Sequence, residues 1–398
     1  MENGSRPLPQ NGSRPLTQNG SRPLPQNGSR PPLDGGRLGY VDWARGIAVL
    51  LMIEAHTVDA WTRLAARNTI GFRNATVLGG FAAPLFLWLA GFGVAIAAAR
   101  TEQRRGRTAA AEAACRRGLE IFVLGFLFRL QALLLTPGGA LVTIFRVDIL
   151  NVMGPSMIAA GLLWAAVGTT GARVAVLSTA AAIVAMATPI VRAGTSVGLL
   201  PLWLQWYLRP YGDMTTFTLF PWAAFVFGGA AVGALTAACA RAGCVRRLQP
   251  WVAAAAAALI AIGFWTASRP TIYAASSFWT SSPTWLAIRL GIVTASVCAL
   301  YAVEAVAATN SRSLAGASVA WSGQRLARFG RASLFIYWIH VELVYGYASW
   351  LWRHRLPLWG TAIACLAFCV LMYDAIAIRD ALVTRRRPRR QTTATAAV

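Results

Sequence analysis

Long apolar runs dominate the chain from residue 37 onward, and short polar stretches rich in arginine separate them. Ten runs approach the length of about 20 residues that an α-helix needs to cross a bilayer. Trp43 and Trp61 bracket the first run, about 27 Å apart on a helix, as expected of tryptophans at two membrane interfaces. The pattern predicts an all-α, polytopic transmembrane bundle with spans near 42–61, 78–98, 117–135, 148–167, 172–190, 216–238, 251–268, 285–307, 330–350 and 357–377.

Composition supports this interpretation and excludes a soluble one. Of the 398 residues, 56% are hydrophobic and 13% are charged, whereas soluble domains carry about 25% charged residues. The net charge is +23, which in a soluble protein would suggest a nucleic-acid partner. Because the arginines lie between hydrophobic spans, topology and anionic lipid explain them better, and we expect a bilayer and no nucleic acid.

The two ends of the chain differ from its middle. Residues 3–34 repeat an eight-residue unit, NGSRPLPQ, four times with small changes. A unit so rich in Pro, Gly, Ser, Asn and Gln cannot bury a core, and it lacks the apolar segment of a signal peptide. We therefore expect a disordered tail over 1–36, a membrane domain over 37–380 and a basic cytoplasmic tail over 381–398.

Arginine counts predict the orientation. With the N-terminus inside, the cytoplasmic segments hold 25 arginines and the opposite segments hold 10. This excess favours a cytoplasmic location for both termini, which also requires an even number of spans. The expected protein is a multi-pass protein of the cell membrane.

Ionisable residues inside the first span need an explanation, because each charge in a bilayer costs at least about 2.5 kcal/mol. On a helix, Asp42, Arg45, Val49, Met52 and His56 fall on one stripe about 21 Å long. Asp42 and Arg45 are three residues apart, so mutual neutralisation is the structural alternative to a binding role for them.

His56 is the candidate general base. His56, Asp59, Arg129, Arg146 and Asp148 should all lie in the outer half of the membrane. A carboxylate would orient the imidazole, while an arginine would stabilise a developing oxyanion. Asp59 is the local carboxylate and Asp148 the one from another helix, and the sequence does not choose between them. A histidine that only bonds a neighbouring helix is the structural alternative.

The ninth span offers further polar groups. Ser333, Tyr337 and His340 lie on one face, whereas Glu342 and Tyr345 lie on another. His340 is either a second site residue or a packing contact. Asn151, near the start of the fourth span, is another candidate. The six cysteines form no CxxC pair, so we expect no metal site.

Four stretches carry a family resemblance: VDWARGIAVLLMIEAH (41–56), GGFAAPLFLWLAGFGVAIAAAR (79–100), FRVDILNVMG (145–154) and FGRASLFIYWIHVELVYG (329–346). In this order they resemble the heparan-α-glucosaminide N-acetyltransferase-like family of the wider transmembrane acyltransferase group. The resemblance implies a multi-helix membrane enzyme that passes an acyl group, usually acetyl, from cytoplasmic coenzyme A to a sugar across the membrane. The matching positions are Asp42, Arg45, His56, Arg146, Asp148, Arg331, Ser333, Tyr337 and His340.

The chain also departs from the animal members of that family, which place their histidine later, in the extracytoplasmic loop. No histidine occurs between residues 57 and 78, so His56 resembles instead the helix-end histidine of bacterial acyltransferases. This leaves open the acceptor, the acyl length, O- or N-acylation, and direct transfer or an acyl-histidine intermediate.

We expect acetyl-CoA or another acyl-CoA as donor, its phosphates bound by cytoplasmic arginines such as Arg116, Arg117 and Arg331. Asp42 and Arg45 would lie along the pantetheine arm, and a carbohydrate would be the acceptor. The alternative is a secondary transporter or flippase, which explains buried ionisable residues equally well. The chain lacks clear internal symmetry of the kind that many transporters show. Homodimerisation stays open.

Overall fold

The computed structural model describes residue 1, residues 38–135 and residues 140–386. The expected tail over 1–36 and most of the basic segment over 381–398 therefore lie outside the described residues. Within them the chain is all-α, without a β-strand, as the sequence predicted. The α-helices are α1 (Gly39–Trp61), α2 (Ile70–Gly79), α3 (Ala82–Arg105), α4 (Arg107–Leu135), α5 (Ile149–Ala166), α6 (Thr170–Ala193), α7 (Leu202–Leu208), α8 (Leu219–Arg241), α9 (Val245–Ala267), α10 (Pro283–Thr309), α11 (Leu314–Arg331), α12 (Ser333–Tyr345) and α13 (Leu358–Arg386).

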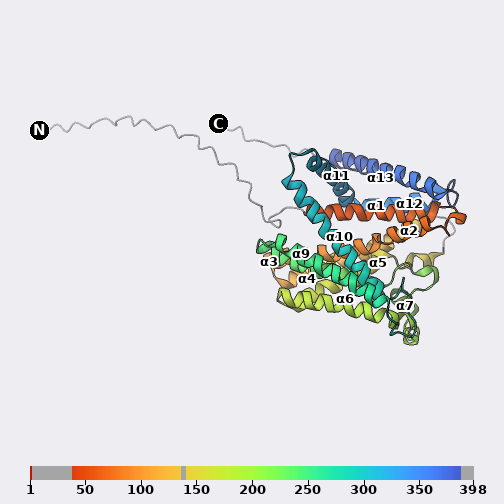
Figure 1. Cartoon of the computed structure of the whole chain (residues 1–398), viewed down its shortest axis with the longest axis horizontal. Coiled ribbons are helices and arrows are strands. Elements are labelled where there is room, and N and C mark those ends of the chain that lie inside the picture. The colour runs from red at the N-terminus through yellow and green to blue at the C-terminus, as the bar shows by residue number, and fades with distance from the viewer. Residues whose placement is uncertain (2–37, 136–139, 387–398) are drawn as a thin grey trace.

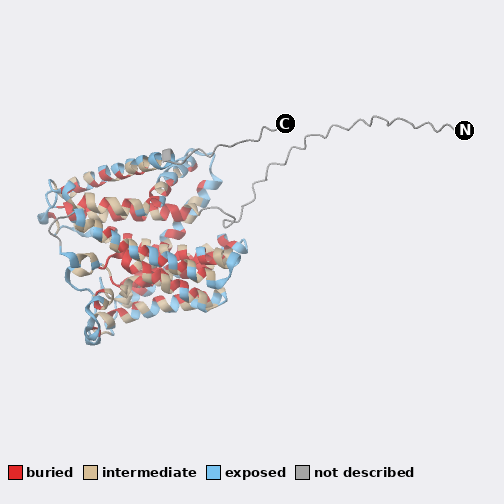
Figure 2. Cartoon of the chain, turned by 180° about the vertical axis from the view of Figure 1, so that it is seen from behind, coloured by how far each residue is buried: buried red, intermediate tan, exposed pale blue. Residues whose placement is uncertain are grey.

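Helix α1 lies in the middle of the bundle, between the α12 and α13 side and the larger group that contains α3 to α10 (Figure 1). Its first half joins a hydrophobic core with α3, α4, α5, α6, α8 and α10, and its second half joins another core with α12 and α13. Buried residues concentrate on α1 and the helices around it, whereas the outer helices are largely exposed (Figure 2). The expected span with the most ionisable residues therefore lies in the interior of the bundle and contributes to both cores.

Eight segments of the described chain are long and apolar enough to cross a membrane. They correspond to eight of the ten expected spans and define a multi-pass membrane protein. Helix α1 is not among the eight, because Asp42, Arg45, Glu54 and Asp59 make it too charged, although its 23 residues are long enough. Helix α12, which corresponds to the ninth expected span, is shorter than expected.

The ninth expected span, 330–350, is wrong as a single helix. Helix α11 ends at Arg331 and α12 covers only Ser333–Tyr345. Gly346 has extended backbone dihedrals, and a short 3₁₀ helix follows at Tyr347–Ser349. The apolar residues after Tyr345 therefore belong to a connection. Hydropathy alone cannot distinguish an apolar connection from an apolar helix.

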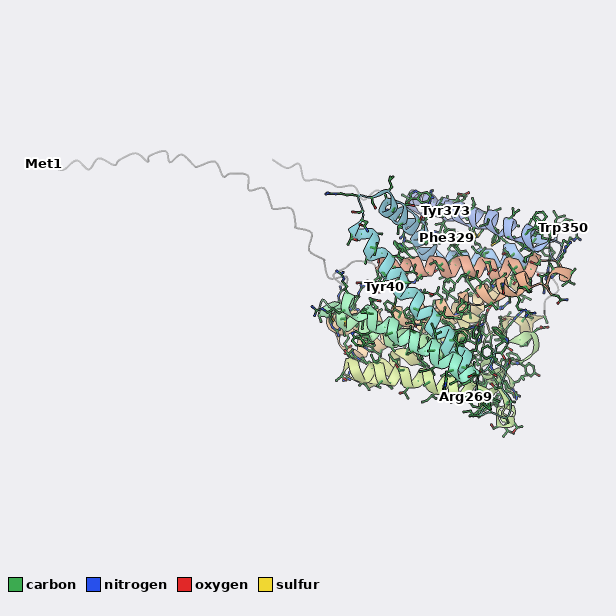
Figure 3. All side chains as sticks on the ribbon, viewed as in Figure 1. Met1, Tyr40, Arg269, Phe329, Trp350 and Tyr373 are labelled. Atoms are coloured by element: carbon green, nitrogen blue, oxygen red, sulfur yellow. The ribbon has the colours of Figure 1, made fainter. Side chains whose placement is uncertain are left out.

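The described chain begins and ends on the same side of the bundle. Tyr40, in the first turn of α1, lies at one end, and Trp350 and Arg269 lie at the other (Figure 3). Helix α13 runs back, so that it ends on the side where α1 begins (Figure 1). This agrees with an even number of crossings, and the cytoplasmic orientation of that side stays a prediction.

Glycines let α3 and α8 touch along their backbones. A β-carbon at Gly91 would overlap the carbonyl of Val226, and one at Gly229 would overlap the carbonyl of Trp88. The two contacts are reciprocal, so the helices approach closely at the centre of the larger core. Close approach through small residues is how membrane helices gain packing energy without a hydrophobic driving force.

We therefore expect Gly91→Ala to loosen this contact. Overpacking of a tight core costs about 1–3 kcal/mol, so the detergent-solubilised protein should lose its monodisperse peak at a lower temperature than wild type. Gly171→Ala is the matched control, because a β-carbon there meets nothing within 4 Å. Equal thermal stability of the two variants would contradict the tight α3–α8 contact.

Candidate active site

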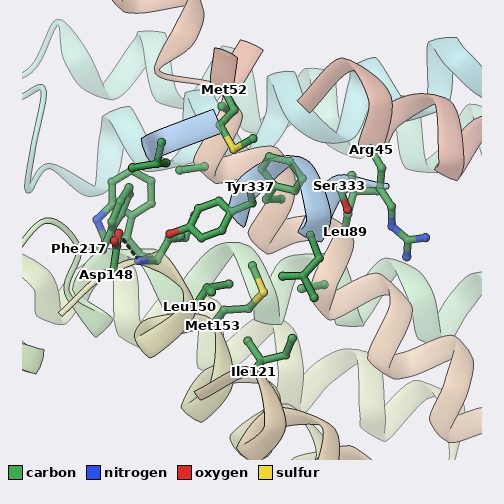
Figure 4. Close-up of a pocket in the computed structure, with 18 of the residues that line it drawn as sticks. Arg45, Met52, Leu89, Ile121, Asp148, Leu150, Met153, Phe217, Ser333 and Tyr337 are labelled. Atoms are coloured by element: carbon green, nitrogen blue, oxygen red, sulfur yellow. Dashed lines mark hydrogen bonds between the residues drawn. The ribbon is translucent and has the colours of Figure 1, made fainter. Parts of the chain in front are cut away.

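A cavity of about 1620 Å³ lies inside the bundle, against the polar stripe of α1. Figure 4 shows Arg45 and Ser333 on one side of it, Asp148 and Phe217 on the other, and Tyr337 between them. The expected stripe of α1 is confirmed in part, since Asp42, Arg45, Met52 and His56 line the cavity, whereas Val49 is fully buried. The cavity draws its remaining wall mainly from α2, α3, α4, α5, α8, α10, α11 and α12.

The side of the cavity that holds Arg45 is rich in arginine. Arg45 Nη1 lies 3.3 Å from the Asp42 carboxylate, so this pair partly neutralises itself as the spacing suggested. Arg117 and Arg331 line the same cavity, and Arg117 also pairs with Glu120 at 2.9 Å.

Arg116 lies elsewhere, in a smaller hollow of about 560 Å³. The lining of this hollow shares Ala113 with that of the main cavity. It gathers Arg100, Arg104, Arg105 and Arg116 around one acidic residue, Glu112. The five expected donor-binding residues thus divide between two adjoining spaces.

His56 contacts a second histidine. Its Nδ1 lies 2.9 Å from Nε2 of His340, and the two rings are nearly parallel with centroids 5.0 Å apart. His340 Nδ1 lies 2.8 Å from the carbonyl oxygen of Ile336 and 3.0 Å from that of Tyr337. His340 is fully buried and does not line the cavity, whereas His56 does. Two candidates from distant parts of the sequence therefore form one unit.

Neither carboxylate expected to orient His56 does so. Asp59 accepts a hydrogen bond from the Tyr345 hydroxyl at 2.9 Å and lies 3.6 Å from Arg67 Nη2. Asp148 forms an ion pair with Arg129 instead. Asp59 lies one turn after His56 and also lines the cavity, with a side chain that is 58% exposed. The nitrogen that a carboxylate would have bound is taken by His340.

Arg129 and Asp148 form a short ion pair. Arg129 Nη2 donates to Asp148 Oδ2 at 2.6 Å, and both side chains are mostly buried. Asp148 is also the N-cap of α5, where Oδ1 accepts from the backbone N–H of Ile149 and Asn151 bonds back to the Asp148 N–H. Tyr337 points toward this pair (Figure 4). The pair therefore fixes α4, the start of α5 and one wall of the cavity together.

Asn151 does not line the cavity. Its side chain accepts from the Asp148 N–H and packs against Gly125 of α4. Its place in the first turn of α5 makes it the second half of a capping box. The geometry gives Asn151 a structural role, whereas the other candidates Arg146, Ser333 and Tyr337 all line the cavity.

Four ionisable residues of the cavity wall were not among the candidates: Arg67, Arg289, Glu342 and Tyr345. The two arginines count among the charges outside the membrane in the sequence prediction, although Arg289 lies inside α10. An arginine within a predicted span is itself a signal of a polar interior. Glu342 and Tyr345 belong to the second face of the ninth span, which also borders the cavity because α12 lies at its edge.

Arg146 lies just before α5, at the Asp148 side of the cavity. It donates to the Thr216 hydroxyl at 3.0 Å. Burial lowers the pKa of the Arg146 guanidinium, yet an arginine stays protonated at neutral pH. A fixed positive charge therefore borders the cavity wall near the Arg129–Asp148 pair.

Fold and site together define a polytopic membrane protein with an internal cavity lined by histidine, arginine and carboxylate groups. The family model for the catalytic region of heparan-alpha-glucosaminide N-acetyltransferase matches residues 37–268, more than half of the chain. The chain belongs to this family, a family of membrane acetyltransferases, as the sequence resemblance predicted. No curated protein matches it. Helices α10 to α13, with Arg289, Ser333, Tyr337 and His340, lie outside the matched residues.

We expect Asp148→Asn to destabilise the fold, because it leaves the largely buried Arg129 charge without its partner. Removing one member of a buried pair costs up to about 3–5 kcal/mol, and the partial exposure of this pair places the cost toward the lower end. The double variant Arg129→Gln, Asp148→Asn should recover much of the loss, since no charge is left behind. Thermal unfolding in detergent measures both, and a double variant no better than the single one would contradict the pairing.

Proposed function

We propose that this protein transfers an acetyl group from cytoplasmic acetyl-CoA to a sugar hydroxyl or amine on the extracytoplasmic side of the cell membrane. The observation that carries the proposal is the position of His56. Its ring borders a single cavity whose wall also holds arginines on the Arg45 side and the Arg129–Asp148 pair on the other. Family membership supports the acetyl-transfer chemistry.

The donor would enter from the side of the cavity that holds Arg45. Coenzyme A carries phosphate groups, and guanidinium groups bind phosphate through paired hydrogen bonds. Arg331, Arg117 and the arginines of the smaller hollow are the candidates for the phosphates. The pantetheine arm would then follow α1 past Arg45 toward His56, eleven residues on, a distance of about 16 Å along the helix.

The transfer itself needs a base and stabilisation of negative charge. His56 would take the proton from the acceptor hydroxyl or amine as its oxygen or nitrogen attacks the thioester carbonyl carbon. The carbon–sulfur bond then breaks, and the departing thiolate takes up the proton. Arg129 and Arg146 are the cationic groups of the cavity wall that could stabilise the oxyanion formed in between.

The acceptor would occupy the side of the cavity near Asp148. Phe217 and Trp222 line it there, with ring centroids 4.8 Å apart. Aromatic faces pack against the apolar faces of sugar rings, while Thr216 and Glu342 supply hydrogen-bonding groups. This mixture of aromatic and polar side chains favours a carbohydrate acceptor over a purely apolar one.

A transporter would also need a polar interior, and it is the second candidate. It leaves the thioester intact, whereas an acetyltransferase consumes it. Purified protein in liposomes with labelled acetyl-CoA inside and a sugar such as glucosamine outside separates the two. Labelled sugar together with free coenzyme A supports the enzyme, and unchanged acetyl-CoA under these conditions contradicts it.

We expect His56→Gln to reduce turnover by about 100-fold to 10,000-fold, the usual contribution of a positioned general base. Membrane insertion and monodispersity should stay normal, because the residue lines a cavity and does not fill a core. His354→Asn is the matched control. His354 lies in a connection at a left-handed φ of 55°, a conformation that asparagine tolerates. Turnover in His56→Gln equal to that of the control would remove His56 from the mechanism.

Arg331→Gln tests the donor side. Loss of one charge-assisted hydrogen bond to phosphate, worth about 1.5–3 kcal/mol, should raise KM for acetyl-CoA by about tenfold or more with little change in kcat. The control is Arg312→Gln, an exposed arginine before α11 that does not line the cavity. An unchanged KM in Arg331→Gln would exclude Arg331 from donor binding.

A further inference from the structure

We propose that His340 is a positioning residue that fixes the tautomer of His56, in the role that a carboxylate has in many hydrolases. This deepens the proposed function and rests on it where turnover is concerned. The geometry at His340 is independent of that function. It follows from three hydrogen bonds and from the burial of one ring.

The protonation of His340 follows from its neighbours. Its Nδ1 faces two backbone carbonyl oxygens, those of Ile336 and Tyr337. Carbonyl oxygens only accept hydrogen bonds, so the proton of the ring must be on Nδ1. The ring is fully buried, and an isolated buried charge is costly, so we take it as neutral with one proton. Its Nε2 therefore carries a lone pair.

The protonation of His56 follows in turn. The lone pair of His340 Nε2 lies 2.9 Å from His56 Nδ1, so His56 must donate a proton from Nδ1. Since a neutral imidazole has one N–H, the other ring nitrogen of His56, Nε2, carries a lone pair. That is the protonation state a general base needs at the nitrogen left free for substrate.

The rigidity of His340 makes this assignment useful for catalysis. Both carbonyl acceptors belong to the helix of His340 itself, three and four residues earlier. The ring is thus held by its own helix and presents Nε2 to α1. When His56 becomes an imidazolium, its Nδ1–H keeps the same acceptor, so proton uptake needs no rearrangement. His340 touches neither the cavity nor a substrate within it.

Two substitutions separate positioning from packing. His340→Gln can place its amide oxygen where Nε2 was, and so can still accept from His56 Nδ1–H. His340→Asn is shorter, so its amide can donate to the Ile336 carbonyl but does not reach His56. Both keep a polar side chain in the same buried position, which makes them matched variants.

We expect His340→Asn to lower kcat by about tenfold to a hundredfold, the usual effect of losing a residue that orients a histidine. KM for acetyl-CoA should change little, and His340→Gln should restore most of the turnover. Assays use purified full-length protein in liposomes with acetyl-CoA and glucosamine. Once the wild type is shown to transfer acetyl, equal turnover in wild type and His340→Asn, or equal loss in the Asn and Gln variants, would overturn the proposal.

A spectroscopic measurement tests the tautomers of His56 and His340 independently of transfer activity. The chain has only three histidines, so nitrogen-15 NMR of histidine-labelled protein in liposomes near pH 8 can resolve them, with His56→Gln and His354→Asn as assignment variants. We expect the proton on Nδ1 in both His56 and His340, opposite to the usual preference of free histidine, and a shift of His56 toward Nε2–H in His340→Asn. His56 protonated on Nε2 in wild type would overturn the proposal even if transfer activity is found. If the expected tautomers are observed and transfer is absent, only the proposed function fails.

Discussion

The cost of placing ionisable side chains in a bilayer is the constraint on which the rest of this structure depends. Helix α1 carries Asp42, Arg45, Glu54, His56 and Asp59, and each charge facing lipid would cost at least about 2.5 kcal/mol. In the bundle, α1 packs into two hydrophobic cores, and a cavity runs along its polar stripe. The central position of the span with the most ionisable residues and the existence of the cavity are two results of the same constraint.

The polar groups that border the cavity are held by partners from other helices. Asp148 joins α5 to α4 through Arg129, and His340 joins α12 to α1 through His56. Each partner occupies one polar atom of the side chain that it bonds. The other polar atoms of that side chain therefore point in a fixed direction. A membrane interior strengthens such pairs, since water does not compete for them. The site is therefore prearranged by contacts that also hold the helices together.

Much of this could be predicted from the amino-acid sequence. The ten apolar runs predicted the helices that form the bundle, because hydrophobic length is imposed by the bilayer itself. The 3.6-residue period predicted that Asp42, Arg45 and His56 share a face, and all three line the cavity. The ninth span failed because the residues after Tyr345 are apolar without being helical. The candidate partners of His56 failed as well, because Asp59 accepts from Tyr345 and Asp148 pairs with Arg129.

Local properties of the chain thus belong to the sequence: which segments are apolar enough to cross a bilayer, and which face of α1 is polar. The capping box of Asp148 and Asn151 was not predicted, since both residues were expected in the site. Tertiary structure decided which side chains from distant segments meet. The contact between His56 and His340 spans 284 residues, and the cavity wall draws Arg289 and Glu342 from helices that no periodicity connects to α1. Such pairings depend on how helices are arranged around one another, and that arrangement is set by packing between surfaces, not by any property of a single helix.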